Sequence, residues 1–272
     1  MKRFTLLFLA VFTTVALFAQ EAETKKADTT RINLGDTELI IVDKRGKSEE
    51  DFDTEINEED PIKKEPESNA HWAGVDFGFS VLLNNDMEGK FPNNPYWQND
   101  AARSQTWNLN LFEHKFKIAQ NYVGITTGLG VSFTSVAFRD NYLIRNTPDT
   151  LYATTDSLVY SKNKLKASYL TIPLLLEFNT NNDEDKAFYL AAGVVGGVRI
   201  GSKVKRVGEV NGSDFKEKLK GTYGLSSFKV DAALRMGYAD WGVFANYSLM
   251  PLFDTQKTVE VYPLTFGLSY NF

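Results

Sequence analysis

Apolar and polar side chains alternate along the last nine residues of the chain, from Leu264 to Phe272. Large apolar residues occupy every second position, and small or polar residues fill the gaps: Leu264, Phe266, Leu268, Tyr270 and Phe272 against Thr265, Gly267, Ser269 and Asn271. Successive side chains of a β-strand point to opposite faces, so one face of this segment is apolar and the other is polar. Such a strand is an aggregation hazard as a free edge in water, but a closed barrel in lipid accommodates it.

The same alternation recurs from Trp72 onward, with turn-forming residues between the segments. The pattern predicts eight strands, at residues 72–83, 105–117, 122–137, 165–179, 187–200, 227–238, 241–249 and 262–272. Each has about the ten residues, or somewhat more, that a tilted strand needs to cross the hydrocarbon core. We therefore expect an all-β fold over residues 71–272, an eight-stranded up-and-down antiparallel transmembrane β-barrel.

The connections between these segments alternate in length. Residues 119–121, 180–186 and 239–240 form short links, and residues 84–104, 138–164, 201–226 and 250–261 form long ones. Bacterial barrels have short periplasmic turns and long outer loops, and an even strand count puts both ends of the barrel domain on the periplasmic side. The alternative is a soluble β-sandwich or lipocalin-like barrel, which would pack these apolar faces against a core.

Both ends of the chain carry features typical of export. Residues 1–19 combine the basic start Met1-Lys2-Arg3 with a mostly apolar run and a plausible cleavage point at Ala19-Gln20, which predicts a secretory signal peptide. The terminal Phe272 on an alternating strand resembles the signal that the barrel assembly machinery reads. The chain has no cysteine, which excludes disulfides and thiolate metal sites.

Residues 20–70 form an acidic segment before the predicted barrel. Between Lys47 and Asn69 ten acidic residues face three lysines, a net charge of −7 in a chain whose total is −5. This composition cannot bury enough apolar surface to fold, so we expect a mostly disordered periplasmic arm. Residues 31–42 are β-prone, and they are either a tethered strand fragment or a strand that adds to a partner's sheet edge.

One strand carries a family resemblance. Tyr169-Leu170-Thr171-Ile172-Pro173-Leu174-Leu175-Leu176 resembles the Tyr-Leu-x-Ile-Pro-Leu-Leu-Leu strand of the PorT-like outer-membrane β-barrel family of Bacteroidota. Residues 247–253 and the terminal Phe272 are also similar to that family. The resemblance implies an outer-membrane barrel of a Gram-negative bacterium. It implies no particular activity, because the members of that family share a barrel and not a common activity. Pro173 cannot donate to a β-ladder, so we expect it at a bulge or an unpaired position.

Several charged side chains fall on the face opposite the apolar one. The alternation places them in the lumen, four toward the periplasmic end (Asp76, His114, Glu177 and Arg235) and three toward the outer end (Arg199, Lys229 and Asp231). An eight-stranded barrel has room only for side chains, so these charges should pair and fill it. We expect an ion pair between Glu177 and Arg235, and a periplasmic aromatic belt of Phe178, Phe188, Tyr238, Trp241, Tyr270 and Phe272.

The sequence offers little for catalysis, a metal or a cofactor. The only histidines are His71 and His114. His114 is next to Glu113, but adjacent residues of a strand point to opposite faces, which spoils them as a catalytic pair. No Gly-x-Ser-x-Gly motif and no paired-histidine spacing occurs. We expect no enzyme, no catalytic residue, no metal and no cofactor.

The function indicated is a non-enzymatic outer-membrane module for interaction or scaffolding, in secretion or envelope organisation. The alternatives are a narrow gated pore and, more distantly, a lipid-modifying barrel enzyme. Candidate outer-loop contacts are three aromatic and three basic residues: Phe91, Tyr96, Trp97, Lys203, Lys205 and Arg206. The expected partners are the lipid bilayer, lipopolysaccharide, the barrel assembly machinery and a periplasmic or envelope protein, but no nucleic acid.

Overall fold

The computed structural model describes residues 29–34, 37–42, 70–139, 141–210 and 213–272. The chain divides into two units, residues 1–63 and 64–272. In the first, β1 (Thr29–Leu34) and β2 (Thr37–Val42) form an antiparallel pair. This pair coincides with the segment predicted to be β-prone. The predicted signal peptide and acidic tract lie outside the described residues.

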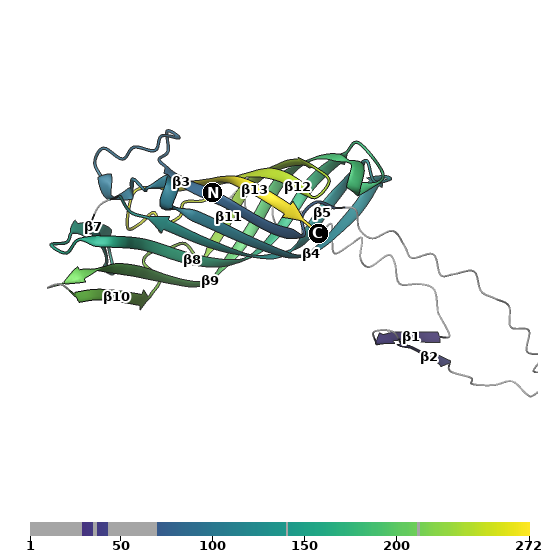
Figure 1. The fold of residues 1–272 in the computed structure, drawn as a ribbon, viewed down its shortest axis with the longest axis horizontal. Coiled ribbons are helices and arrows are strands. Elements are labelled where there is room, and N and C mark those ends of the chain that lie inside the picture. Colours follow the sequence, from purple (N-terminus) through teal and green to yellow (C-terminus); the bar gives the residue numbers. More distant parts are fainter. Residues whose placement is uncertain (1–28, 35–36, 43–69, 140, 211–212) are drawn as a thin grey trace, which may run out of the picture. The chain divides into compact units, whose positions relative to one another are not determined.

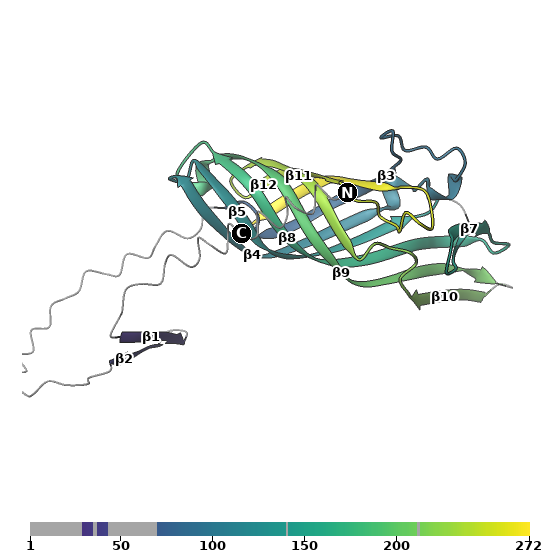
Figure 2. The same ribbon diagram turned by 180° about the vertical axis from the view of Figure 1, so that it is seen from behind.

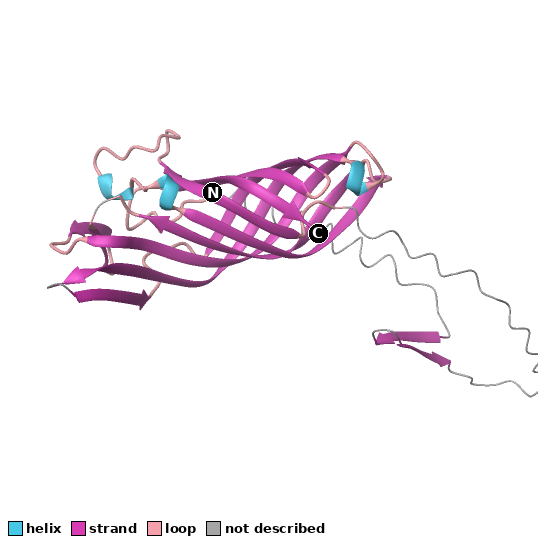
Figure 3. Ribbon diagram, viewed as in Figure 1, coloured by secondary structure: helices cyan, strands magenta, loops and turns pink. Residues whose placement is uncertain are grey.

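The second unit contains a closed ring of eight antiparallel strands (Figures 1 and 3). The ring runs through β3 (Gly74–Leu83), β4 (Gln105–Ala119), β5 (Val123–Ala137), β8 (Tyr160–Asn179), β9 (Phe188–Val210), β11 (Phe228–Tyr238), β12 (Trp241–Ser248) and β13 (Tyr262–Asn271). β13 pairs with β3 and so closes the ring. The predicted fold class and strand count are confirmed, and the observed strands overlap the predicted ones in every case.

The outer connections are more regular than the sequence suggested. β8 and β9 are 20 and 23 residues long and stay paired past the rest of the barrel, where β10 (Ser213–Lys220) pairs with β9 as a third strand (Figure 2). β6 (Tyr142–Asn146) pairs with β7 (Leu151–Thr155) in another outer loop. The described residues also contain three short 3-10 helices, η1 (Pro95–Trp97), η2 (Ala101–Arg103) and η3 (Glu184–Lys186). No helix within the described residues is long and apolar enough to cross a membrane.

The outer wall of the barrel is apolar and exposed. Its exposed side chains include Leu170, Ile172, Leu174 and Leu176 on β8, and Phe266 and Leu268 on β13. The six residues of the predicted belt are all exposed: Phe178, Phe188, Tyr238, Trp241, Tyr270 and Phe272. They lie at the inner ends of their strands, and four of the rings contact in tilted pairs, Phe188 with Tyr238 at 4.7 Å and Trp241 with Tyr270 at 5.0 Å between centroids. The predicted aromatic belt therefore lies at the inner rim of the barrel, where these strands end.

Three of the irregularities in the strand pairing change which residues face each other. A bulge in β4 between Asn110 and Phe112 shifts its register against β5. A second shift, beside Ser168 and Tyr169 of β8, leaves Ile200 of β9 without a partner. The ladder of β5 and β8 is interrupted between Leu174 and Thr171, which brackets Pro173. Pro173 therefore sits at an unpaired position on its β5 side, as its missing N–H predicts.

Candidate functional site in the barrel lumen

The segment before the first barrel strand folds into the inner end of the lumen. Ala70, His71, Trp72 and Ala73 are all buried, although the sequence pattern had placed the strand start at Trp72. Gly74 makes this entry possible, because its φ of +149° is rarely adopted by other residues and a Cβ there would lie 2.1 Å from the Tyr270 carbonyl oxygen. Gly128 gives Trp72 room, since a Cβ at Gly128 would lie 2.9 Å from the indole. Residues 70–73 are called the plug below.

One side of the plug covers a buried arginine. Arg235 on β11 donates to both carboxylate oxygens of Asp76 on β3, at 2.9 Å each. Asn108 and Asn110 on β4 donate to the same carboxylate at 3.2 and 3.1 Å. The guanidinium carbon lies 5.1 Å from the centre of the Trp72 ring, within cation–π range. A bidentate pair with further hydrogen bonds is the arrangement that offsets the desolvation of two buried charges.

Glu177 on β8 anchors the other side of the plug. One carboxylate oxygen accepts from Lys115 at 3.0 Å and lies 3.0 Å from His71 Nδ1, and the other accepts from Thr126 at 2.7 Å. The His71 ring stacks on Tyr189, with centroids 4.0 Å apart. The expected ion pair between Glu177 and Arg235 is therefore wrong: both are buried in the lumen, but each has another partner.

His114 is a second correction. Its side chain is exposed on the outer face beside Phe116, not in the lumen. The bulge in β4 is the physical reason, because one extra residue reverses the facing of every side chain that follows. The same reversal turns Glu113 inward, where it accepts from the backbone N–H groups of Trp72 and Ala73 at 2.9 and 2.6 Å.

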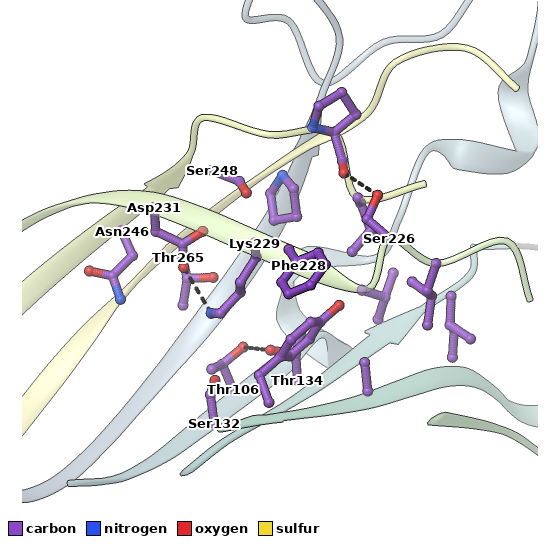
Figure 4. A pocket seen from close by; sticks show the side chains of 18 of the residues that line it. Thr106, Ser132, Thr134, Ser226, Phe228, Lys229, Asp231, Asn246, Ser248 and Thr265 are labelled. Atoms are coloured by element: carbon purple, nitrogen blue, oxygen red, sulfur yellow. Dashed lines mark hydrogen bonds and ion pairs between the residues drawn. The ribbon is translucent and has the colours of Figure 1, made fainter. Parts of the chain in front are cut away.

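The middle of the lumen is polar and nearly filled. Ser80 joins Thr106 and Thr265 through hydroxyl contacts of 2.9 and 2.8 Å. Lys229 and Asp231 of β11 form an ion pair at 2.8 Å beside a cavity of about 50 Å³, whose other lining residues include Thr106 (Figure 4). Arg199, the remaining outer-end charge, is half-buried and donates to the Ser226 carbonyl and to the Ser202 hydroxyl.

The outer loops pack into an apolar cluster above this cavity, called the outer cap below. Its buried members come from the loops and the outer strand ends: Leu82, Phe91, Trp97, Val136, Phe138, Ile144, Leu151, Leu165, Ala167, Tyr169, Val204, Leu225, Phe253 and Val261. The Trp97 ring lies 4.4 Å from that of Phe253, and its indole N–H donates to Thr258 at 3.1 Å. Phe91 and Trp97 are therefore wrong as exposed contacts, and Tyr96 is half-buried against the same cluster.

The predicted basic contacts separate onto two faces of the outer sheet. Lys203 is exposed and Lys205 half-buried, whereas Arg206 points inward, is buried and pairs with Glu217 at 3.0 Å. Near this pair Tyr160 donates to Asp156, and burial together with that hydrogen bond raises the pKa of Tyr160 to about 12. Arg206 is therefore a structural residue of the sheet, and of the three predicted basic contacts only Lys203 and Lys205 lie on its surface.

Most charges of the lumen are held in ion pairs, and its middle leaves a cavity of only about 50 Å³. At the inner end an open hollow of about 480 Å³ lies against His71 and Glu113. Sequence reasoning missed Lys115 and His71 as the partners of Glu177. The signal for Lys115 was the adjacent apolar pair Leu111-Phe112, which breaks strict alternation and marks the bulge. Within the described residues no group of three His, Asp or Glu side chains is arranged to hold a metal ion. The geometry positions these side chains to support one another inside the barrel.

The solved structures that are similar to this chain include two of one protein. Both are of Ail, the attachment invasion locus protein of Yersinia pestis. The first is 16% identical, covers 74% of this chain and 99% of Ail, and has a TM-score of 0.31. The second, in complex with the heparin analogue sucrose octasulfate, is 15% identical, covers 73% and 95%, and has a TM-score of 0.30. No curated protein matches the chain.

A family model described as an outer membrane protein beta-barrel domain matches residues 68–257. This range begins just before the plug and takes in seven of the eight strands of the ring. It agrees with the closed ring and with the exposed apolar wall. The chain belongs to the family of outer-membrane proteins with this β-barrel domain.

Proposed function

We propose that this protein is a non-enzymatic interaction or scaffold module of the outer membrane, acting in secretion or envelope organisation within the PorT-like branch of barrels. The observation that carries the proposal is the filling of the lumen. The plug lies across the inner end above an open hollow of about 480 Å³, ion pairs and hydroxyl contacts fill the middle, and the outer cap covers the outer end. The working surfaces are then those that project beyond the lipid.

Two such surfaces are present in the sequence. One is the outer sheet of β8, β9 and β10 with the loops around it. The other is the arm of residues 20–70, whose β-prone segment 31–42 is proposed to contact a periplasmic or envelope protein. Export through a cleaved signal peptide and assembly through the C-terminal strand complete the proposal. The distinction from an enzyme rests on the lumen, where each of the buried acids Asp76 and Glu177 is held by a cation.

Site-specific photo-crosslinking in native outer membranes tests the proposal. The probe amino acid replaces an exposed outer-loop residue, Met87 or Val159, and in the control it replaces Leu174 on the lipid-facing wall. We expect a discrete protein adduct from an outer position and only lipid adducts from Leu174. Only lipid adducts from every outer and arm position would contradict an interaction module. A changed mass of membrane lipid A on expression would instead support the enzyme alternative.

A further inference from the structure

The outer sheet carries lysines in rows across its three strands. Pairing aligns Lys166, Lys203 and Lys220 in one row, and Lys164, Lys205 and Lys218 in the next. A third row contains Lys162 and Lys216 on either side of Val207. Directly paired residues share a face, so all eight lysines lie on one side of the sheet. This side is called the lysine face below.

The lysine face continues the lipid-facing wall of the barrel. On β8 the even-numbered residues from Leu170 to Phe178 face outward, and Lys166, Lys164 and Lys162 follow on the same side. On β9 the unpaired Ile200 reverses the alternation, which brings Lys203 and Lys205 to that side as well. The opposite side of the sheet is buried in the outer cap through Leu165 and Val204. The wall therefore changes from apolar to cationic within four residues of Leu170.

The rows contain no carboxylate that would neutralise them. The acidic residues on this side, Glu209 and Asp214, lie directly opposite each other at the tip of the sheet, beyond the third row. Like charges placed directly opposite each other on a sheet are destabilising. Burial and the neighbouring lysines lower the pKa of Lys166 and Lys205. A row of anions beside these lysines would remove that repulsion.

We propose that the lysine face binds the phosphate groups of phosphorylated glycolipids in the outer leaflet around the barrel. The occupant is assigned to the membrane and not to a soluble polyanion because of where the face lies. Its first row begins where the lipid-facing side chains end, at the height of the headgroups, and it points sideways toward the neighbouring lipids. The inference deepens the proposed function by naming a ligand for one of its two surfaces.

The test uses the full chain in detergent, titrated with diphosphorylated lipid A and followed by native mass spectrometry. The row variant is Lys166→Gln/Lys203→Gln/Lys220→Gln, which removes the row nearest the lipid. The matched control is Lys90→Gln/Lys117→Gln/Lys186→Gln, which removes the same charge from exposed positions elsewhere. A basic residue near an anionic surface changes affinity about fivefold, so three together predict a loss of about 100-fold. Heat-modifiable mobility verifies that both variants are folded.

We expect the row variant to bind lipid A about 100-fold more weakly, the control to bind it as the parent does, and dephosphorylated lipid A to bind every protein weakly. Equal affinities of the row and control variants, or equal binding of dephosphorylated lipid A, would overturn the proposal. So would a row variant that loses affinity for a soluble sulfated polysaccharide but keeps its affinity for lipid A. None of these outcomes bears on the crosslinking of a protein partner, so the two proposals fail separately.

Discussion

Leu174 provides a direct test of the lipid-facing wall. Its side chain is 45% exposed on the outer face of β8, four residues from Phe178 at the inner rim. With a rise of about 3.4 Å per residue and a strand tilt of about 40°, the residue lies about 10 Å into an apolar band about 25 Å tall. This depth is close to the midplane, where an arginine on the lipid face costs about 2–4 kcal/mol. Leu174→Arg should therefore reduce the folding equilibrium constant by roughly 30- to 1,000-fold.

Val159→Arg is the matched control. Val159 is an apolar residue with 72% exposure, but it lies in the outer loop before β8, where an arginine meets water. The assay is reversible urea unfolding of the full chain in lipid vesicles, followed by tryptophan fluorescence and by heat-modifiable mobility. We expect Val159→Arg to stay within about 0.5 kcal/mol of the parent. Equal unfolding free energies for the two variants would refute the assignment of the outer wall to lipid.

Three further predictions concern the interior. Glu177→Gln removes the negative charge that lies 3.0 Å from the ammonium of buried Lys115, so the unfolding free energy should fall by about 3–5 kcal/mol. Lys115→Met in the same chain should restore part of that free energy, and no recovery would argue against the ion pair. Gly74→Ala should prevent formation of the heat-modifiable species, because a Cβ collides with the Tyr270 carbonyl; normal folding would contradict this entry geometry. Trp97→Ala removes a fully buried ring and should cost about 3–5 kcal/mol. It should also open the outer loops to protease while the barrel stays intact, and unchanged protection would count against the outer cap.

Alternation was sufficient to predict the barrel because each face of each strand meets one environment. Leu170 to Phe178 and Leu264 to Phe272 follow the two-residue period without interruption, and the structure keeps their facing. The alternation placed His114 on the wrong face because His114 follows the bulge in β4. A two-residue period continues through a bulge as if the extra residue were not there. Glu177 kept its predicted facing, yet its partner was missed because Lys115 lies past the same bulge.

The outer end was predicted least well. Phe91 and Trp97 lie in a loop rich in polar residues, so their burial depends on contacts with segments far away in the sequence, such as Phe253. The outer extensions of β8 and β9, residues 160–164 and 201–210, were predicted to be loop because their lysines and polar residues do not resemble a membrane strand. Outside the lipid the exposed face of a strand is free to be cationic, so the same β-structure carries a different pattern.

Conductance of the full chain in planar lipid bilayers tests the central claim most directly. The claim is that the plug, the paired lumen charges and the outer cap close the barrel, so that it works through its surfaces. We predict no discrete current steps from protein whose insertion has been verified by heat-modifiable mobility of the recovered material. Reproducible steps that persist across voltages and scale with the amount of inserted protein would contradict the closed lumen and establish the pore alternative.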